Sequence, residues 1–146
     1  QYLVDGNIKI ADPLSPLILD PNNDGNIGSL NYPNPIPYPS SKTNGFVTVM
    51  EPGKTPYNWV NTNFSPPAKK DLIIYELLVR DFVASHSYKT LIDTLDYLSN
   101  LGINAIELMP PGEFENNESW GYNPSFHMAL DKYYGTLNIK EYSAIW

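Results

Sequence analysis

The chain has 146 residues, a formal net charge of −7 and no cysteine. This length suffices for one ordinary domain or two small ones. An acidic chain without a basic cluster is a poor candidate for binding a nucleic-acid backbone, and a chain without cysteine has no disulfides and no thiolate zinc site. No apolar run approaches the roughly 18 residues that a membrane-spanning helix needs, so we expect neither nucleic acid nor membrane as a partner.

The first part of the chain is rich in proline: 11 of the 14 prolines fall between Pro13 and Pro67. Proline breaks helices, so this part cannot contain long ones. Tyr2–Ile10 predicts two short strands around an Asp-Gly turn, and Phe46–Met50 predicts another strand. The segment Asn31–Pro39 is stiffened by alternating prolines. We interpret residues 1–66 as the end of a small antiparallel β domain with its linker, with a proline-rich peptide ligand as the alternative.

After Pro67 the pattern predicts a strand, a helix and a second, parallel strand. The run Leu72–Val79 is almost continuously apolar, which is typical of a strand that is buried on both faces. Ser85 or Ser87 can cap the following helix, and Gly102 can end it. Ile103–Met109 is the second strand. The apolar residues of the helix recur at helical spacing: Tyr88, Leu91, Ile92, Leu95, Leu98 and Leu101.

Aromatic and acidic side chains follow the second strand. Trp120 and Tyr122 lie beyond the carboxyl end of a parallel strand, which is where barrel enzymes build their ligand sites. A pyranose ring presents a flat patch of C–H groups, so an aromatic face suits it. The alternative is that both rings only pack the loop. The glutamates of this loop are expected to be solvated: Glu113, Glu115 and Glu118.

Two further carboxylates, Glu76 and Glu107, lie inside the predicted strands. Glycoside hydrolysis needs two carboxylates about 5–10 Å apart, and these two are candidates by position. Structural hydrogen bonding is the favoured interpretation, because strand carboxylates below the end of a barrel usually have such a role.

One segment has the spacing of a calcium loop. Asp20, Asn22 and Asp24 offer oxygens at positions one, three and five, with Gly25 at six. The twelfth position is Asn31 instead of glutamate, and nearby prolines forbid an entering helix. A turn held by side-chain-to-backbone hydrogen bonds is therefore favoured over calcium. His86 and His127 lack ligand spacing, and we expect no metal or cofactor in this chain.

Four motifs together resemble the start of the catalytic barrel of glycoside hydrolase family 13, the α-amylase superfamily. They are Ile74–Phe82, Leu95–Pro110, Ser119–Pro124 and Asp131–Thr136. Upstream, Val4-Asp-Gly, Ile10–Pro13 and Asp20-Pro21 are similar to the tail of the immunoglobulin-like domain that precedes such barrels and resembles carbohydrate-binding module family 48.

The resemblance implies an α/β fold, an incomplete (β/α)8 TIM barrel that contains the first strand, the first helix, the second strand and the following loop. The tail of a β-sandwich would precede it. The expected division is residues 1–66 for the β domain and linker, and residues 67–146 for the barrel portion. Two strands cannot close a barrel, so the open sheet edge could drive self-association.

In this family, the tyrosine after the second strand stacks on the sugar, and Tyr122 matches it. Trp120 belongs to the same substrate-binding loop. The catalytic carboxylates and the motif of the third strand have no counterpart here, so we expect no catalytic residue in this chain. Two departures from the family are Pro111-Gly112 and the sequence after Thr136.

The resemblance therefore implies a fragment of an enzyme that acts on α-1,4-linked glucan by a retaining mechanism, inactive alone. The parent would be an α-amylase, branching or debranching enzyme, with calcium left open for the complete protein. A non-catalytic glucan-binding module and an unrelated β/α protein are the alternatives. The location of the protein is also left open among secreted, periplasmic and cell-surface.

Overall fold

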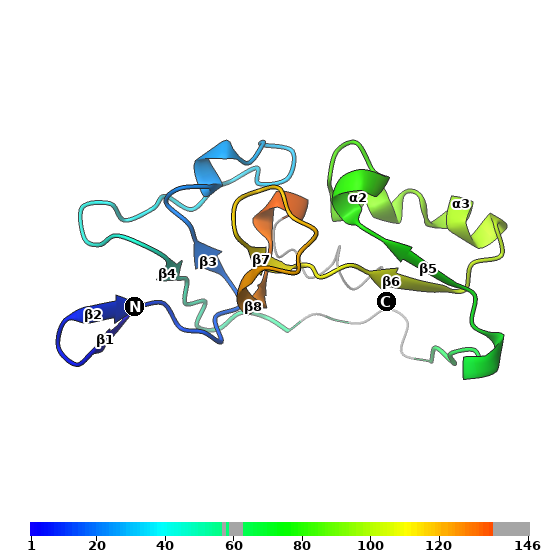
Figure 1. Cartoon of the computed structure of the whole chain (residues 1–146), viewed down its shortest axis with the longest axis horizontal. Coiled ribbons are helices and arrows are strands. Elements are labelled where there is room, and N and C mark those ends of the chain that lie inside the picture. Colours follow the sequence, from blue (N-terminus) through cyan, green and yellow to red (C-terminus); the bar gives the residue numbers. More distant parts are fainter. Residues whose placement is uncertain (57, 59–62, 136–146) are drawn as a thin grey trace.

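The computed structural model describes residues 1–56, 58 and 63–135, which form an elongated molecule. Its described strands pair into four two-stranded sheets. The first four strands lie at one end of the long axis, and the helices with β5 and β6 lie at the other (Figure 1). The last pair, β7 and β8, lies between these two ends, so the chain returns to its middle after building both.

The N-terminal end contains two antiparallel pairs. β1 (Tyr2–Val4) pairs with β2 (Ile8–Ile10), which confirms the predicted hairpin. Asp5 and Gly6 have φ of +50° and +75° in its turn, the left-handed values that such hairpin turns favour. β3 (Ile18–Leu19) pairs with β4 (Val47–Thr48), and the 3-10 helix η1 (Asp24–Asn26) lies between them in sequence.

The predicted parallel unit is present. After the 3-10 helix η2 (Lys69–Asp71), β5 (Ile74–Leu77) pairs in parallel with β6 (Ala105–Leu108). The side chain of Asn104 aligns the two strands at their start. Its Oδ1 accepts a hydrogen bond from Ile73 N at 2.7 Å, and its Nδ2 donates to Asp71 O at 2.9 Å. These bonds supplement the backbone ladder at the strand ends.

The single predicted helix is instead two short ones, preceded by a further turn, α1 (Val79–Phe82). α2 (Tyr88–Ile92) ends where the Thr94 hydroxyl donates to Leu91 O at 2.6 Å, and α3 (Leu95–Asn100) follows. Such bonds from threonine to the preceding turn compete with a regular helix. Leu101, beyond the end of α3, is 56% exposed instead of packed.

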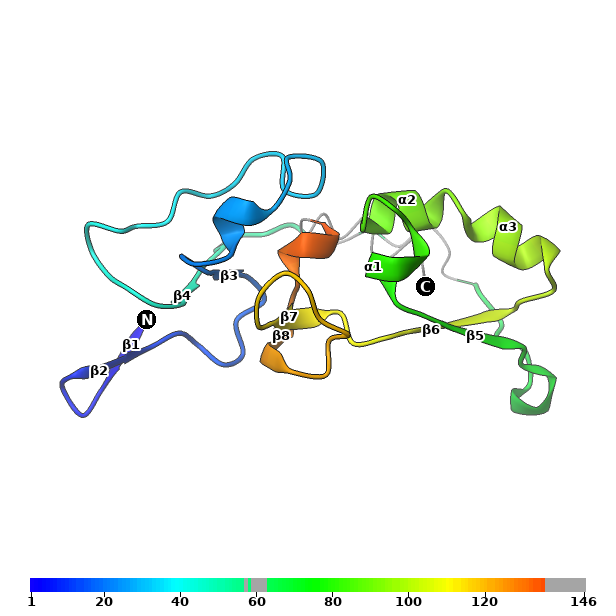
Figure 2. The same ribbon diagram turned by 45° about the horizontal axis from the view of Figure 1, so that its top comes forward.

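The predicted ends of this helical segment are confirmed. The Ser87 hydroxyl accepts a hydrogen bond from Lys89 N and caps α2. Gly102, with φ of +86°, follows α3. Figure 2 shows the helices on one side of β5 and β6. Leu91 and Leu98 are fully buried beneath them.

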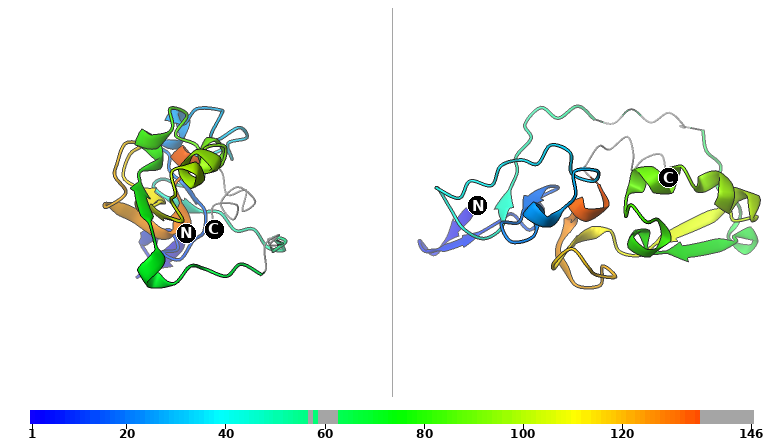
Figure 3. Two further views of the ribbon diagram at one scale, coloured as in Figure 1. Left: turned by 90° about the vertical axis from the view of Figure 1, so that its right-hand side faces the viewer. Right: turned by 90° about the horizontal axis from the view of Figure 1, so that it is seen from above.

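A hairpin that the sequence did not predict connects the two ends of the molecule (Figure 3). It consists of β7 (Gly112–Phe114) and β8 (Pro124–Leu130), and the 3-10 helix η3 (Lys132–Tyr134) follows. Prolines at positions 110, 111 and 124 disguise these strands in the sequence, because proline is unfavourable inside a sheet but acceptable where a strand begins. The predicted departure after Thr136 lies outside the described residues.

The hairpin contributes to both hydrophobic clusters. Phe114 and Tyr134 join the cluster under the helices, and Phe126 and Ala129 join the one beside β3. Phe126 also meets Phe46 edge-to-face, with ring centroids 5.2 Å apart. The remaining buried members of the helical cluster are Leu77, Leu78, Val79, Val83, Tyr88, Leu91 and Leu98.

Candidate functional site

The predicted aromatic residues lie on the loop between β7 and β8, residues 115–123, which we call the aromatic loop. Trp120 is 63% exposed and Tyr122 is 65% exposed. Because they are this exposed, both rings are accessible to a ligand. The loop follows β7 and does not leave β6 directly.

Gly121 fixes the shape of the aromatic loop. It is buried and has φ of +88°, and a Cβ atom there would lie 2.0 Å from Pro110 O, just after β6. The Ser119 hydroxyl accepts a hydrogen bond from Gly121 N at 2.9 Å and also pairs with Asn123 Oδ1. The loop thus closes onto the end of the parallel pair, and its two aromatic neighbours remain exposed on either side of Gly121.

The expectation that all loop glutamates are solvated is wrong for Glu113. Glu115 and Glu118 are exposed, but Glu113 is buried in β7. Its two carboxylate oxygens accept hydrogen bonds from Lys132 Nζ at 2.6 and 2.7 Å. The same ammonium lies 3.2 Å from Asp24 Oδ1 in the N-terminal region. A carboxylate in this position cannot remain solvated, because the hairpin closes over it.

Asp131 completes this group, which we call the charge cluster: Asp24, Glu113, Asp131 and Lys132. The carboxylate of Asp131 accepts hydrogen bonds from Phe114 N at 3.1 Å and from Tyr133 N at 2.7 Å. It therefore joins the first strand of the hairpin to η3. The side chain of Lys132 is only 2% exposed, which is unusual for a long charged side chain. Buried lysine side chains are rare unless carboxylates surround them.

Three carboxyl groups face one ammonium in the charge cluster, and burial disfavours their charged forms. Burial raises the pKa of Glu113 to about 8, against the opposing effect of Lys132. Burial also raises the pKa of Asp131 to about 6. For Lys132, burial works to lower the pKa, but Glu113 and Asp24 outweigh it and raise the pKa. Burial is thus the main cause of the raised carboxyl pKa values in the cluster, and Lys132 opposes it.

The segment with calcium-loop spacing is a turn held by its own side chains, as the favoured interpretation predicts. Asp20 Oδ1 accepts a hydrogen bond from Asn22 N at 2.8 Å, and Asp20 Oδ2 accepts one from Asn23 Nδ2 at 2.6 Å. Asp24 Oδ2 accepts one from Asp20 N at 3.0 Å. With Asp24 Oδ1 already paired to an ammonium, this donor set does not fit a calcium ion.

The other candidates are not brought together with the aromatic loop. Glu76 and Glu107 are direct neighbours on β5 and β6, and both are exposed. Within the described residues neither forms a hydrogen bond or an ion pair, so their expected structural role is absent there. His86 Nδ1 donates to Arg80 O at 2.7 Å, and its ring stacks on Tyr133. His127 is exposed on β8.

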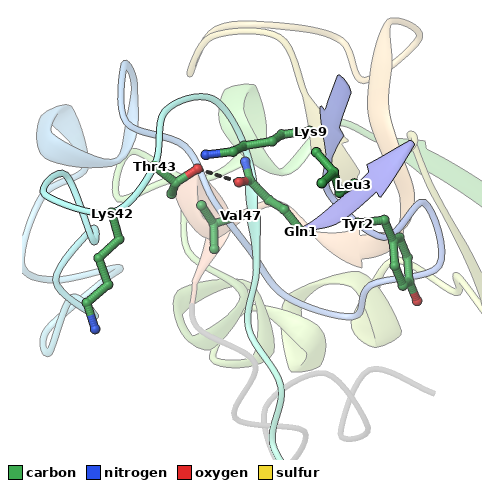
Figure 4. Close-up of a pocket in the computed structure, with 7 residues that line it drawn as sticks. All are labelled: Gln1, Tyr2, Leu3, Lys9, Lys42, Thr43 and Val47. Carbon is green, nitrogen blue, oxygen red and sulfur yellow. Dashed lines mark hydrogen bonds between the residues drawn. The ribbon is translucent and has the colours of Figure 1, made fainter. Parts of the chain in front are cut away.

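The N-terminal region contains a cavity of about 310 Å³. Figure 4 shows its lining, in which the side chains of Thr43 and Gln1 form a hydrogen bond. The aromatic loop contributes nothing to it, so this cavity and the predicted site are separate. The lining residues are Gln1, Tyr2, Leu3, Lys9, Lys42, Thr43 and Val47.

Among the described residues, no cluster of histidine and acidic side chains has the geometry of a metal site. The helices in that part of the chain are also too short or too polar to cross a membrane. The arrangement offers two exposed aromatic faces on a braced loop. Glu113, the acidic residue at the start of this loop, is paired with Lys132 and is not free to act as an acid or base there.

Sequence reasoning missed Lys132 and its partners. The motif that contains Asp131 and Lys132 was noticed only for its resemblance to a family. A usable signal was the lysine itself, which directly precedes two tyrosines that both pack inward. Its partners could not be identified from sequence, because Asp24 is more than a hundred positions away.

No family model matches the chain. Over 135 residues it is 29% identical to the malto-oligosyltrehalose trehalohydrolase of Saccharolobus solfataricus, a match that covers 92% of this chain and 20% of that protein. Over 97 residues it is 36% identical to isoamylase 3, chloroplastic, of Oryza sativa subsp. japonica, covering 58% of this chain and 12% of that protein.

The fold also has a counterpart among solved structures. A crystal structure of a protein from Salmonella typhimurium, provisionally named an α-amylase, superposes with a TM-score of 0.68 over 97% of this chain and 20% of that one, at 24% identity. The chain spans a fifth or less of the length of these proteins. These relatives confirm the resemblance to glycoside hydrolase family 13, the α-amylase superfamily.

Proposed function

We propose that this chain is part of an enzyme that acts on α-1,4-linked glucan, and that the aromatic loop contacts the sugar. One observation carries the proposal: Trp120 and Tyr122 are both largely exposed on a loop that Gly121 closes against Pro110. Two exposed aromatic rings that lie close together on a fixed loop are a common feature of ligand-binding surfaces. The faces of sugar rings are partners of matching shape.

Fixing the rings also suits a positioning role. A braced loop loses little further conformational freedom when the sugar binds, so more of the contact energy appears as affinity. Correct placement of a glycosidic bond beside the reacting groups contributes to the rate itself. We therefore assign Tyr122 to the sugar at the cleavage point and Trp120 to a neighbouring contact.

The catalytic groups are proposed to come from outside this chain. A retaining reaction needs a nucleophile and an acid about 5 Å apart. Glu113 is paired with Lys132, while the exposed Glu76 and Glu107 lie on strands that only a larger barrel would cover. On this proposal, residues 67–146 are the first part of a catalytic barrel and residues 1–66 are the end of a β domain. The chain alone is then inactive.

The names of the relatives favour particular substrates. A trehalohydrolase acting on malto-oligosyltrehalose and an isoamylase both match this chain, so the parent enzyme is proposed to act on such α-glucans. A non-catalytic glucan-binding module is the second candidate, because the loop could bind sugar without any catalytic group. Calcium remains a proposal for the complete enzyme only, since the turn around Asp20 does not suit it.

Calorimetric titration of the chain with maltoheptaose tests the proposal. Trp120→Ala and Tyr122→Ala should each weaken binding about three- to tenfold, which is the worth of one aromatic contact. Tyr97→Ala is the matched control, because Tyr97 is 60% exposed on α3, away from the loop. Equal losses in all three variants, or none in the loop variants, would show that the loop does not bind glucan.

The release of reducing sugar from the same samples tests whether this chain alone is inactive. We expect the chain to release none above a buffer blank. Release in proportion to the added chain, and unaffected by Tyr122→Ala, would contradict the assignment of the catalytic groups to another part of the enzyme. A longer version of the protein should hydrolyse the glucan, because it would supply the catalytic residues. If the longer version does not hydrolyse it, the binding-module interpretation is favoured.

A further inference from the structure

The turn around Asp20 touches the β7–β8 hairpin at two separate places. At the base of the hairpin, Asp24 Oδ1 lies 3.2 Å from Lys132 Nζ. In the aromatic loop, Asn117 Nδ2 donates a hydrogen bond to Asn23 O at 3.0 Å. Consecutive residues of one turn therefore contact both the base of the hairpin and the loop that carries Trp120 and Tyr122.

The turn is a firm support for these contacts. The carboxylate of Asp20 is buried and bonds to two groups inside the turn, and Asp24 bonds back to the backbone of Asp20. A short segment with so many internal bonds has few alternative conformations, since each bond restricts the backbone between its partners. The turn can therefore hold the residues that it contacts in a fixed position.

The hairpin itself needs such support. Its ladder has register shifts on both sides of Glu113, so the strands alone do not fix the direction of the loop. The bidentate pair between Lys132 and Glu113 crosses the base at this irregular point. In the loop, Asn117 lies three positions before Trp120, and its bond to Asn23 crosses to another part of the chain.

We propose that Asn117 and Lys132 are positioning residues, through which the 20–26 turn sets the orientation of the aromatic loop for its ligand. The inference rests on the proposed glucan-binding role of that loop. It gives the N-terminal region an indirect part in substrate binding, because the region acts through the loop and none of its own side chains needs to touch the sugar. Asn117 acts on the loop, and Lys132 acts on the base from which the loop emerges.

The test uses the chain labelled with 5-fluorotryptophan, in which the 19F resonance of Trp120 is identified by its loss in Trp120→Phe. Asn117→Ala removes the bond to Asn23 and should shift or broaden this resonance, with the thermal midpoint unchanged. Affinity for maltoheptaose should fall about three- to tenfold, the worth of one hydrogen bond. Asn34→Ala, an exposed asparagine of the N-terminal region, is the matched control.

Lys132 is tested by comparing two substitutions. Lys132→Arg keeps a cation between Glu113 and Asp24 and should largely retain the Trp120 resonance. Lys132→Met should displace it. Because Lys132→Met could unfold the chain, the decision rests on Asn117→Ala, whose side chain is only partly buried.

An unmoved Trp120 resonance in Asn117→Ala would overturn the inference, and so would a moved resonance with unchanged affinity. If the resonance moves but the unaltered chain binds no maltoheptaose, the proposed function fails while the structural coupling stands. A loss of affinity in Asn34→Ala equal to that in Asn117→Ala would also overturn it, because the effect would then not depend on the bond to Asn23.

Discussion

The β1–β2 and β7–β8 hairpins differ sharply in their surroundings. In the β1–β2 hairpin every strand residue is exposed, including Leu3 at 60% and Ile8 at 53%. In the β7–β8 hairpin Glu113, Phe114 and Ala129 are buried. The first hairpin is exposed and is held mainly by its turn residues and its ladder. The other is enclosed by residues that come from both ends of the molecule.

The comparison shows that residues close in sequence can set the turn of a hairpin, whereas contacts with distant residues set the position of its loop. Asp5 and Gly6 adopt the φ values that close the first hairpin, and the sequence predicts this turn from two residues. The second hairpin has an irregular ladder and still presents a defined loop. The position of this loop depends on tertiary contacts made by Lys132, Gly121 and the 20–26 turn.

The largest expected effect is at Lys132. Lys132→Met leaves Glu113 and its neighbouring carboxylates buried without their cation, which should lower the free energy of unfolding by about 3–5 kcal/mol. Lys9→Met in the exposed first hairpin is the matched change and should stay within about 0.5 kcal/mol. Urea unfolding measures both. Equal effects at the two lysines would mean that the second hairpin is no better enclosed than the first.

Glycine substitutions in the two hairpins sharpen the comparison. Gly121→Ala combines a left-handed φ with a Cβ atom 2.0 Å from Pro110 O, so a loss of about 2–4 kcal/mol is expected. Gly6→Ala has φ of +75° and open space around the new methyl group, so only about 1 kcal/mol is expected. Thermal midpoints of both variants check this. The prediction is wrong if Gly6→Ala is the more damaging change.

The smallest expected effect is a pH dependence that belongs only to the enclosed hairpin. The pKa of Glu113 is raised from 4.5 to about 8, so the folded chain binds more protons than the unfolded chain in that window. Stability should therefore fall as pH rises through neutrality, by at most about 1.4 kcal/mol per pH unit for each proton. Asp131, raised from 3.8 to about 6, adds to the lower part of the window.

Glu113→Gln identifies the source of this slope, because a neutral amide cannot lose a proton. Its unfolding midpoint should change less between about pH 6.5 and 7.5 than that of the unaltered chain. Lys132, whose pKa is raised above 10.5, loses its stabilising effect only in strongly alkaline solution and does not contribute near neutrality. A slope that persists in Glu113→Gln would assign the effect to other groups.

Much of the fold could be predicted because it is encoded locally. The first hairpin, the parallel pair of β5 and β6, the Ser87 cap and the exposed positions of Trp120 and Tyr122 all follow from turn residues, apolar runs and capping preferences. The family resemblance was predicted from four motifs and is confirmed by the relatives. Each of these features depends on residues that are close in sequence or that recur with a regular period.

The features that were missed depend on distant partners. Glu113 looks like a solvated loop residue until Lys132 is placed beside it, and nothing near Glu113 in the sequence identifies that lysine. The β7–β8 pairing was hidden by Pro111 and Pro124, which mark turns more often than strands. The break between α2 and α3 depends on one hydroxyl of Thr94 that bonds backward instead of pointing to solvent.

Asn31 has a consequence for how the chain acquires its structure. Its Nδ2 donates to Ser85 O at 3.0 Å and to Tyr133 O at 2.7 Å, and these partners are 54 and 102 positions away. Closing such long loops costs entropy before the contacts form, which slows folding. During synthesis, residues near the N-terminus must wait until Tyr133 has left the ribosome, so the N-terminal region completes its docking among the last events of folding.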